Sequence, residues 1–271
     1  MSAWIGAIII GLVLLGALVS FFWTPWDPTH VDPANRLLGS SAEHLMGTDR
    51  YGRDVFSRIL VGAQTSIGVG LVAVGISLLI GTPLGILAGM RGGWVESLVM
   101  RGADLVLAFP GLLMAIIATA IVGPSTWTAM AALGLAGSPS FARVARSGTL
   151  RVMAQDFILA ARQAGRPGVE IAARHVLPNI AGLVLVQISV GFALAILAEA
   201  ALSFLGLGTP PPQPSWGRML QDAQASLATA PHLVLWPGLA IALTVLGFSL
   251  LGDGVRDLVD PRSTMTRRSA Q

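Results

Sequence analysis

The chain has 271 residues, of which 54% are hydrophobic and 11% charged, with a mean hydropathy of +0.72 and a formal net charge of +3. Soluble domains carry about 25% charged residues, so this composition excludes a soluble globular protein and indicates an integral membrane protein with room for about six spans of ~20 residues. The sequence contains neither Cys nor Lys, which excludes disulfides, thiolate catalysis, Cys-ligated metals and a P-loop lysine, so any ATP hydrolysis must be done by another chain.

The first predicted element is a transmembrane span over residues 1–23, because this run is apolar and Trp4, Trp23 and Trp26 suit the two membrane interfaces. No basic residue precedes the run and its apolar core is too long for a signal peptide, so we expect an uncleaved anchor. Residues 24–60 are polar and charged, and we expect them to form an extracytoplasmic segment.

Five more apolar runs lie in a predicted membrane core over residues 61–252. Together with the first they predict an all-α, polytopic membrane protein with six transmembrane helices in a single transmembrane domain, residues 1–271. The approximate limits of the five runs are 61–90, 104–123, 127–143, 180–207 and 233–251. The first of these contains Gly81-Thr82-Pro83, where we expect a kink because proline interrupts helical hydrogen bonding. Residues 208–214 predict a stiff, proline-rich connector, and residues 253–271 a polar tail.

The distribution of arginines predicts the orientation in the membrane. When the spans alternate, twelve arginines fall on one side and five on the other, and the richer side is expected to be cytoplasmic. Both termini and the polar insert at residues 156–178 are then cytoplasmic. The arginines cluster at span ends, so we read the net charge as a topology signal and expect no nucleic-acid partner. The twelve are Arg91, Arg101, Arg143, Arg146, Arg151, Arg162, Arg166, Arg174, Arg256, Arg262, Arg267 and Arg268, and the five are Arg36, Arg50, Arg53, Arg58 and Arg218.

The insert at residues 156–178 predicts two short helices joined by a tight corner. Asp156 can begin the first, Gly165 is a natural C-terminal stop, and Pro167-Gly168 make the corner before a second helix over residues 169–176. An apolar face of small residues on the first helix lets another surface approach closely, and its members are Phe157, Ala160, Ala161 and Ala164. A rigid knob of this kind is suited to dock in a groove of a partner and to move the span that follows. The alternative is an amphipathic connector that lies on the bilayer and sets its arginines against anionic lipid.

The spacing within the insert resembles the coupling loop of ABC importer permeases. The pattern in that family is Glu-Ala-Ala, three residues, Gly, nine residues, an aliphatic residue, one more residue, and Leu-Pro. The positions that keep this spacing are Ala160, Ala161, Gly165, Leu177 and Pro178. Two positions depart from it, because Leu159 stands where Glu is usual and His175 where the aliphatic residue is. Leu159 removes a possible ionic contact to an ATPase arginine and leaves the shape of the knob intact.

Further motifs occur in the order in which they stand in the dipeptide, oligopeptide and nickel subfamily of these permeases. They resemble its second, six-span permease subunit, from about Gly47 to the end of the chain. The segments that carry the resemblance are residues 47–58, 92–94, 108–110, 174–179, 202–208, 211–217, 251–254 and 260–262.

The resemblance implies a non-catalytic subunit of the bacterial plasma (inner) membrane that forms half of a translocation pathway for di- and oligopeptides. The implied partners are a sister permease, one or two cytoplasmic ATPases, and an extracytoplasmic substrate-binding protein. The chain itself is expected to hold no cofactor, because ATP and Mg are bound by the ATPases. The ATPase-coupling residues that we expect are Ala160, Ala161, Gly165, Pro167, Gly168, Val169, Glu170, Leu177 and Pro178.

Two alternatives to this function stay open from the residues. One is another small solute as cargo, such as nickel. The other is a self-sufficient secondary transporter or channel, although such proteins usually have several intramembrane ionisable groups and this chain has one deep carboxylate. An intramembrane enzyme is disfavoured, because the sequence has no Cys and no Gly-x-Ser-x-Gly elbow.

The deep carboxylate is Glu199. On insertion scales such a residue costs about 2.5 to 3.5 kcal/mol, so it should face protein or water. We expect either a pathway residue near the outer mouth, where it would meet a peptide's amino terminus, or a hydrogen bond between packed helices. Asp104 is expected to form an interfacial pair with Arg101. The loop from Pro210 to Trp216 is expected to contact the binding protein, to shape the outer gate, or simply to be a stiff turn.

Overall fold

The computed structural model describes residues 2–259, and within them the regular structure is helical, which confirms the all-α prediction. Only one isolated β-bridge, between Thr48 and Asp54, lies in the described part of the chain. The long helices are α1 (Ser2–Val19), α2 (Val55–Arg91), α3 (Gly93–Leu107), α4 (Gly111–Val122), α5 (Thr126–Met153), α8 (Leu177–Phe204) and α10 (His232–Val259). The short ones are α6 (Asp156–Gln163), α7 (Gly168–Ile171) and α9 (Trp216–Ala223).

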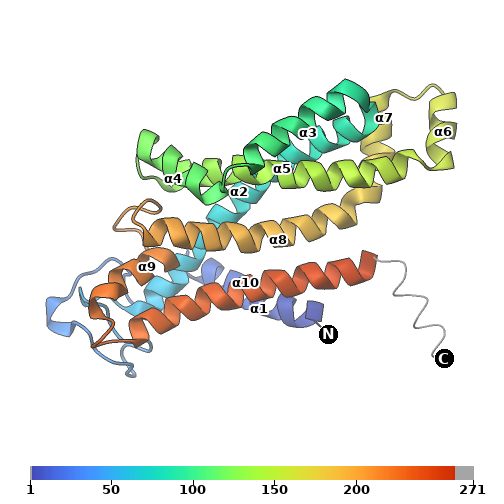
Figure 1. The fold of residues 1–271 in the computed structure, drawn as a ribbon. Coiled ribbons are helices and arrows are strands. Elements are labelled where there is room, and N and C mark those ends of the chain that lie inside the picture. Colours follow the sequence, from blue (N-terminus) through green and yellow to red (C-terminus); the bar gives the residue numbers. More distant parts are fainter. Residues whose placement is uncertain (1, 260–271) are drawn as a thin grey trace, which may run out of the picture.

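The long helices pack side by side, and the polar segments gather at the two ends of the bundle (Figure 1). Helices α6 and α7 lie at one end, together with the start of α1 and the end of α10. The segment between α1 and α2 lies at the opposite end with α9. This is the arrangement that the arginine count requires, although which end faces the cytoplasm stays a prediction.

The predicted count of six spans is not confirmed. Four helices among the described residues are long and apolar enough to cross a membrane, and the count rises to five if α3 and α4 together form one span. Helix α5 was expected to be the fourth span, and its 28 residues suffice in length, but it is not one of these helices. Its sequence explains this, because Gly, Ser and Thr interrupt its apolar residues and three arginines occupy its C-terminal half.

The third predicted span differs from the structure in its start and its shape, while its end agrees. The helix begins at Gly93, not near Asp104, and the chain bends by 76° between α3 and α4. Pro110 explains the break, because it lacks a backbone N–H and disfavours helical geometry at Phe109 before it. The segment is therefore a bent pair of helices.

The start of α2 and the end of α10 also differ from the predicted boundaries. Helix α2 begins at Val55, inside the expected extracytoplasmic segment, because the Asp54 carboxylate caps it by accepting from Ser57 N at 2.7 Å. The same helix continues through Pro83. Helix α10 extends to Val259, so the first part of the predicted tail is helical, while residues 260–271 lie outside the described residues.

Helices α2 and α5 approach each other closely through glycines spaced four residues apart on α2. A Cβ on Gly81 would lie 2.2 Å from Ser138 O, and one on Gly85 would lie 2.2 Å from Ala142 O. Small residues allow this backbone contact between helices in a membrane, where apolar side chains gain little by leaving lipid. From the sequence, Gly81-Thr82-Pro83 predicted only a kink here, and the contact with α5 was not expected.

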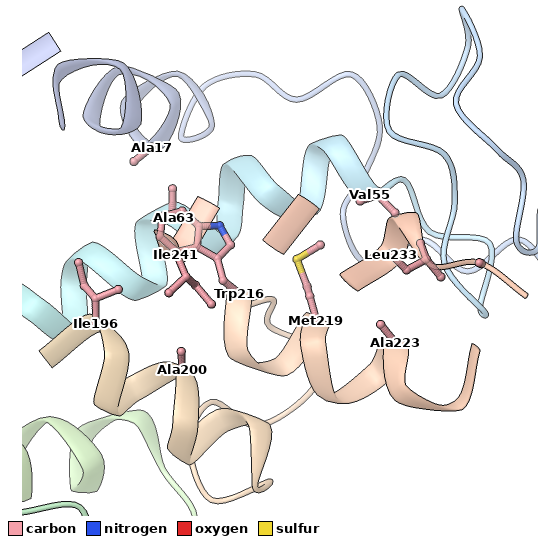
Figure 2. Close-up of a cluster of buried hydrophobic side chains, with 11 residues drawn as sticks. Ala17, Val55, Ala63, Ile196, Ala200, Trp216, Met219, Ala223, Leu233 and Ile241 are labelled. Carbon is pink, nitrogen blue, oxygen red and sulfur yellow. The ribbon is translucent and has the colours of Figure 1, made fainter. Parts of the chain in front are cut away.

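The largest buried cluster joins α1, α2, α8, α9 and α10 (Figure 2). Its central side chain is Trp216, which is 2% exposed and points from α9 toward Ala63 of α2. The indole Nε1 donates a hydrogen bond to Ile59 O at 3.0 Å. Short α9 is therefore fixed to the membrane helices by a buried aromatic side chain and holds this end of the bundle together.

Candidate functional site

The predicted coupling loop forms two short helices, α6 and α7, and so has the shape that its sequence predicted. Gly165 ends α6 with a φ of +70°, a conformation that glycine adopts without strain. Two backbone bonds close the turn: Arg166 N donates to Ala161 O at 3.2 Å, and Gly165 N donates to Arg162 O at 3.0 Å. This is the Schellman pattern for ending a helix, and it reverses the chain at a defined point.

The corner continues into the next membrane helix without a break in helical backbone. Pro167 lies just before α7, and a π-helical turn over residues 172–176 joins α7 to α8. Residues 168–204 consequently form one candidate span of 37 residues. Because π-turns are rare and often lie at functional positions, this junction is a natural place for movement of the loop to reach α8.

Buried aliphatic side chains fix the loop to the bundle. Ile158 of α6 is 0% exposed and Ile171 of α7 is 2% exposed. Both belong to one apolar cluster with Ile86 of α2, Val152 of α5 and Ile180 of α8. The base of the loop is therefore packed against α2, α5 and α8.

Two exposed side chains of the loop, Leu159 and Val169, are apolar, and we call them its tip; Arg162 and Arg166 are exposed beside them in the sequence. Leu159 is 54% exposed and Val169 is 82% exposed, while Ala160 and Gly165 are also exposed. Of the predicted coupling residues, Pro167, Gly168, Leu177 and Pro178 are exposed as well, and Glu170 is half-buried. Ala161 is an exception to the predicted docking face, because it is 7% exposed and packs in the same cluster as Ile158.

Glu170 organises the charges of the loop. Its carboxylate Oε1 accepts from Arg174 at 2.9 Å and also from Arg166, one helical turn away on either side. Leu159 stands where the family usually has Glu. Glu170 is the only acidic residue among the described residues 157–179. His175, the second departure, lies in the π-helical turn, and its ring centroid is 6.1 Å from that of Phe157, so this contact joins the turn to α6.

Glu199 lies in a buried hydrogen-bond group at the other end of α8. It is 1% exposed, and its carboxylate accepts from Ser203 Oγ at 2.7 Å and from Ser66 Oγ of α2 at 3.3 Å. The side chain thus joins two packed helices. Whether it also meets cargo in the assembled transporter stays a prediction.

Asp104 does not pair with Arg101 as expected. Its carboxylate lies 2.5 Å from Arg143 of α5, and both side chains are more than half exposed. A second pair, Glu96 with Arg146, joins the same two helices. These ion pairs connect α3 to α5. The predicted pairing of Asp104 with Arg101 is wrong, because both residues belong to α3 and the carboxylates of this helix pair with arginines of α5.

A cavity that the sequence analysis did not identify lies among α2, α4, α5 and α8. Its volume is about 300 Å³, and it is lined by small residues, by larger apolar ones such as Leu133 and Phe141, and by Ser77, Ser140 and Gln187. Glu199 does not line it. Periodic small and polar residues on α5 and α8 are the signal that would have indicated it. Among the described residues, no cluster of His, Asp or Glu is arranged to hold a metal ion.

Comparison with known proteins gives three consistent results. The family described as "Binding-protein-dependent transport system inner membrane component" matches residues 81–265. The dipeptide transport system permease protein DppC of Alkalihalophilus pseudofirmus is 44% identical over 258 residues, which are 95% of this chain and 85% of that protein. The glutathione transport system permease protein GsiD of Pectobacterium atrosepticum is 41% identical over 261 residues, with 94% and 87% covered.

Solved structures of the MetNI methionine ABC transporter in inward-facing conformations have a similar fold. One crystal form gives a TM-score of 0.60 at 18% identity, covering 73% of this chain and 94% of that chain. A second gives 0.62 at 16% identity, with 75% and 96% covered. At this level of identity the likeness concerns the fold alone.

Proposed function

Because the chain belongs to the family of binding-protein-dependent transport system inner membrane components, we propose that it couples a cytoplasmic ATPase to peptide import through residues 156–178. As a permease subunit of an ABC importer, it is a membrane component and not a self-sufficient secondary transporter or channel. ATP and Mg are bound by the partner chains in this proposal, and the sister permease supplies the other half of the pathway.

One observation supports the coupling role more than any other. The loop presents an exposed apolar tip, Leu159 and Val169, on a base that is packed against three membrane helices. An amphipathic connector lying on lipid would not need buried Ile158 and Ile171 to fix it to the bundle. The exposed tip suits docking in a groove of the ATPase. The packed base suits transmission of the ATPase's movement to the helix bundle.

For the cargo we propose a small peptide. The relatives named above are a dipeptide permease and a glutathione permease, and the matched residues cover 85% and 87% of their lengths. The cavity supports an uncharged path, because its lining is mostly apolar and its three polar side chains, Ser77, Ser140 and Gln187, can exchange hydrogen bonds with peptide groups. Recognition of individual side chains is then left largely to the binding protein.

The proposal is tested by purifying tagged chain from its native membrane in mild detergent and reconstituting what co-purifies in liposomes. We expect a sister permease and an ATPase to be recovered, and uptake of a labelled di- or tripeptide that requires both ATP and binding protein. Recovery of this chain alone, with uptake driven by an ion gradient and independent of ATP, would contradict it.

A further inference from the structure

Four arginines surround one aspartate at the end of the bundle opposite α6 and α7. The aspartate is Asp222 of α9, and its side chain is 10% exposed. Its carboxylate oxygens lie 3.0 Å from Arg53, 3.5 Å from Arg50, 3.6 Å from Arg218 and 3.8 Å from Arg58. Two carboxylate oxygens cannot make close, well-aligned bonds to four guanidinium groups, each of which carries five donors.

The second acid in the group does not balance the charge. Asp49 lies 2.6 Å from Arg53 Nε and 3.7 Å from Arg58 Nε, and its other oxygen accepts from backbone N–H groups. Arginine stays charged at any physiological pH, so four positive charges face two negative ones. The Nε atoms of Arg50 and Arg218 are buried and have no hydrogen-bond partner.

Three of the four arginines line a cavity of about 200 Å³, and Arg50 does not. We call this cavity the Arg pocket, and the lining residues that matter here are Arg53, Arg58, Arg218, Asp222, Pro211 and Pro212. The side chain of Arg58 is only 2% exposed and that of Arg53 is 9% exposed, whereas that of Arg218 is 23% exposed. The deep arginines therefore form the base of the pocket, and Arg218 is the one that an incoming group can reach most easily.

The charge and the size of the Arg pocket restrict what it can hold. Burying like charges is costly unless an opposite charge and further hydrogen bonds accompany them, so the pocket favours an anion. A carboxylate matches the planar, forked donors of a guanidinium group. Sites for free small molecules usually occupy about 300 to 1,000 Å³, so 200 Å³ is better matched to one acidic side chain than to a whole peptide.

We propose that the Arg pocket receives an acidic side chain of the extracytoplasmic binding protein when that protein docks on the permease. This inference rests on the proposed function, which supplies the partner. Helix α9, which supplies Arg218 and Asp222 to the pocket, lies at the end of the bundle away from the coupling loop, where the binding protein delivers its cargo in that proposal. An acid entering it lowers the excess of positive charge around Asp222 from two to one, and complementary charge also speeds and orients the encounter of the two proteins.

The test compares Arg218→Gln with Arg36→Gln in the full reconstituted transporter. Arg36 is an exposed arginine of the segment between α1 and α2 and does not line the pocket, so it controls for a general loss of positive charge. ATPase activity is measured while the purified, peptide-loaded binding protein of the same importer is titrated. Arg218→Gln should raise the half-maximal binding-protein concentration about tenfold and weaken its dependence on salt, with basal activity unchanged. Arg36→Gln should behave like the native chain.

A second variant separates the contribution of positive charge from that of the forked donors, and its thermal stability shows whether folding is affected. Arg218→Lys keeps the positive charge but loses the forked donors, so an intermediate shift at unchanged thermal stability is expected. An unchanged half-maximal concentration in Arg218→Gln overturns the proposal. The proposal is also overturned if Arg218→Gln, at saturating binding protein, impairs transport of peptides with a free carboxyl terminus but not of amidated peptides. The anion in the pocket would then be the cargo. If the native complex is not stimulated by binding protein at all, the proposed function itself fails, and the role of the pocket with it.

Discussion

Single residues fix the shape of the coupling loop, and Gly165 is the clearest case. A Cβ at this position would meet nothing within 4 Å, so neighbouring atoms do not require glycine. The requirement comes from the backbone, because φ is +70° and most L-residues pay about 1–2 kcal/mol for that conformation. Asn tolerates it better than β-branched residues do.

Two substitutions at Gly165 should therefore differ. Gly165→Val should distort the end of α6 and reduce both ATPase co-purification and peptide uptake, while Gly165→Asn should retain most of both. Co-purification is measured by quantitative blotting of the ATPase against the tagged chain. Equal behaviour of the two variants would mean that the backbone conformation at this corner is not what docking requires.

A second prediction at this scale concerns Glu199. Because its carboxylate accepts from Ser66 and Ser203 inside the protein, Glu199→Leu should leave both hydroxyls without this partner and destabilise the chain by about 1–3 kcal/mol. Glu199→Gln keeps an acceptor and should preserve thermal stability and uptake. If Glu199→Gln instead raises the peptide concentration needed for half-maximal uptake at normal stability, the residue meets cargo.

At the scale of elements, adjacent residues of α6 should have separable roles. Ile158 is fully buried and Leu159 is 54% exposed. Ile158→Ala should lower the free energy of unfolding by about 2–5 kcal/mol, because it removes part of the packing that fixes the loop. Leu159→Ala should leave stability unchanged and weaken ATPase association. Thermal unfolding and co-purification distinguish the two, and a loss of stability in Leu159→Ala would contradict the assignment of the exposed tip.

The contact between α2 and α5 gives another prediction for an element. Gly85→Ala places a methyl group where Ala142 O lies 2.2 Å away, so the helices must separate. Gly68→Ala on the same helix meets nothing within 4 Å and is the matched control. We expect Gly85→Ala to lower the melting temperature and uptake in proteoliposomes, and Gly68→Ala to change neither. Normal stability of Gly85→Ala would show that α2 can shift along α5 without cost.

Local signals were enough to predict the coupling loop. Gly165 and Pro167 specify a stop and a corner through their backbone restrictions alone, and α6 and α7 follow. The break at Pro110 was available from the same rule, but hydropathy continues across it and led to a single predicted span. The docking face was harder, because helical spacing does not tell which face of a short helix packs inward, and Ala161 packs inward.

Contacts between distant segments were beyond sequence reasoning. Arg53 and Asp222 lie 169 positions apart, and no pattern in either segment indicates the other. The same holds for Asp104, whose partner Arg143 lies across the bend on another helix. Only the way in which the helices pack brings these charges together, so the Arg pocket could be recognised only in the folded chain.

For the whole molecule, the prediction that matters most is its orientation. The bundle has two chemically different ends, one with α6 and α7 and the other with the segment between α1 and α2 (Figure 1). The coupling proposal requires the first end to be cytoplasmic, and the Arg pocket requires the second to be extracytoplasmic. One experiment on sidedness therefore bears on both.

The chain has no native Cys, so single cysteines can be labelled without background. Leu45→Cys and Leu227→Cys, at positions 57% and 54% exposed, should react with a membrane-impermeant maleimide in intact spheroplasts. Val169→Cys, at an 82% exposed position, should react only after the membrane is permeabilised, in cells lacking the ATPase that would cover it. The reverse pattern would place the loop outside, where no ATPase can reach it, and would remove the basis for coupling and for the docking role of the Arg pocket together.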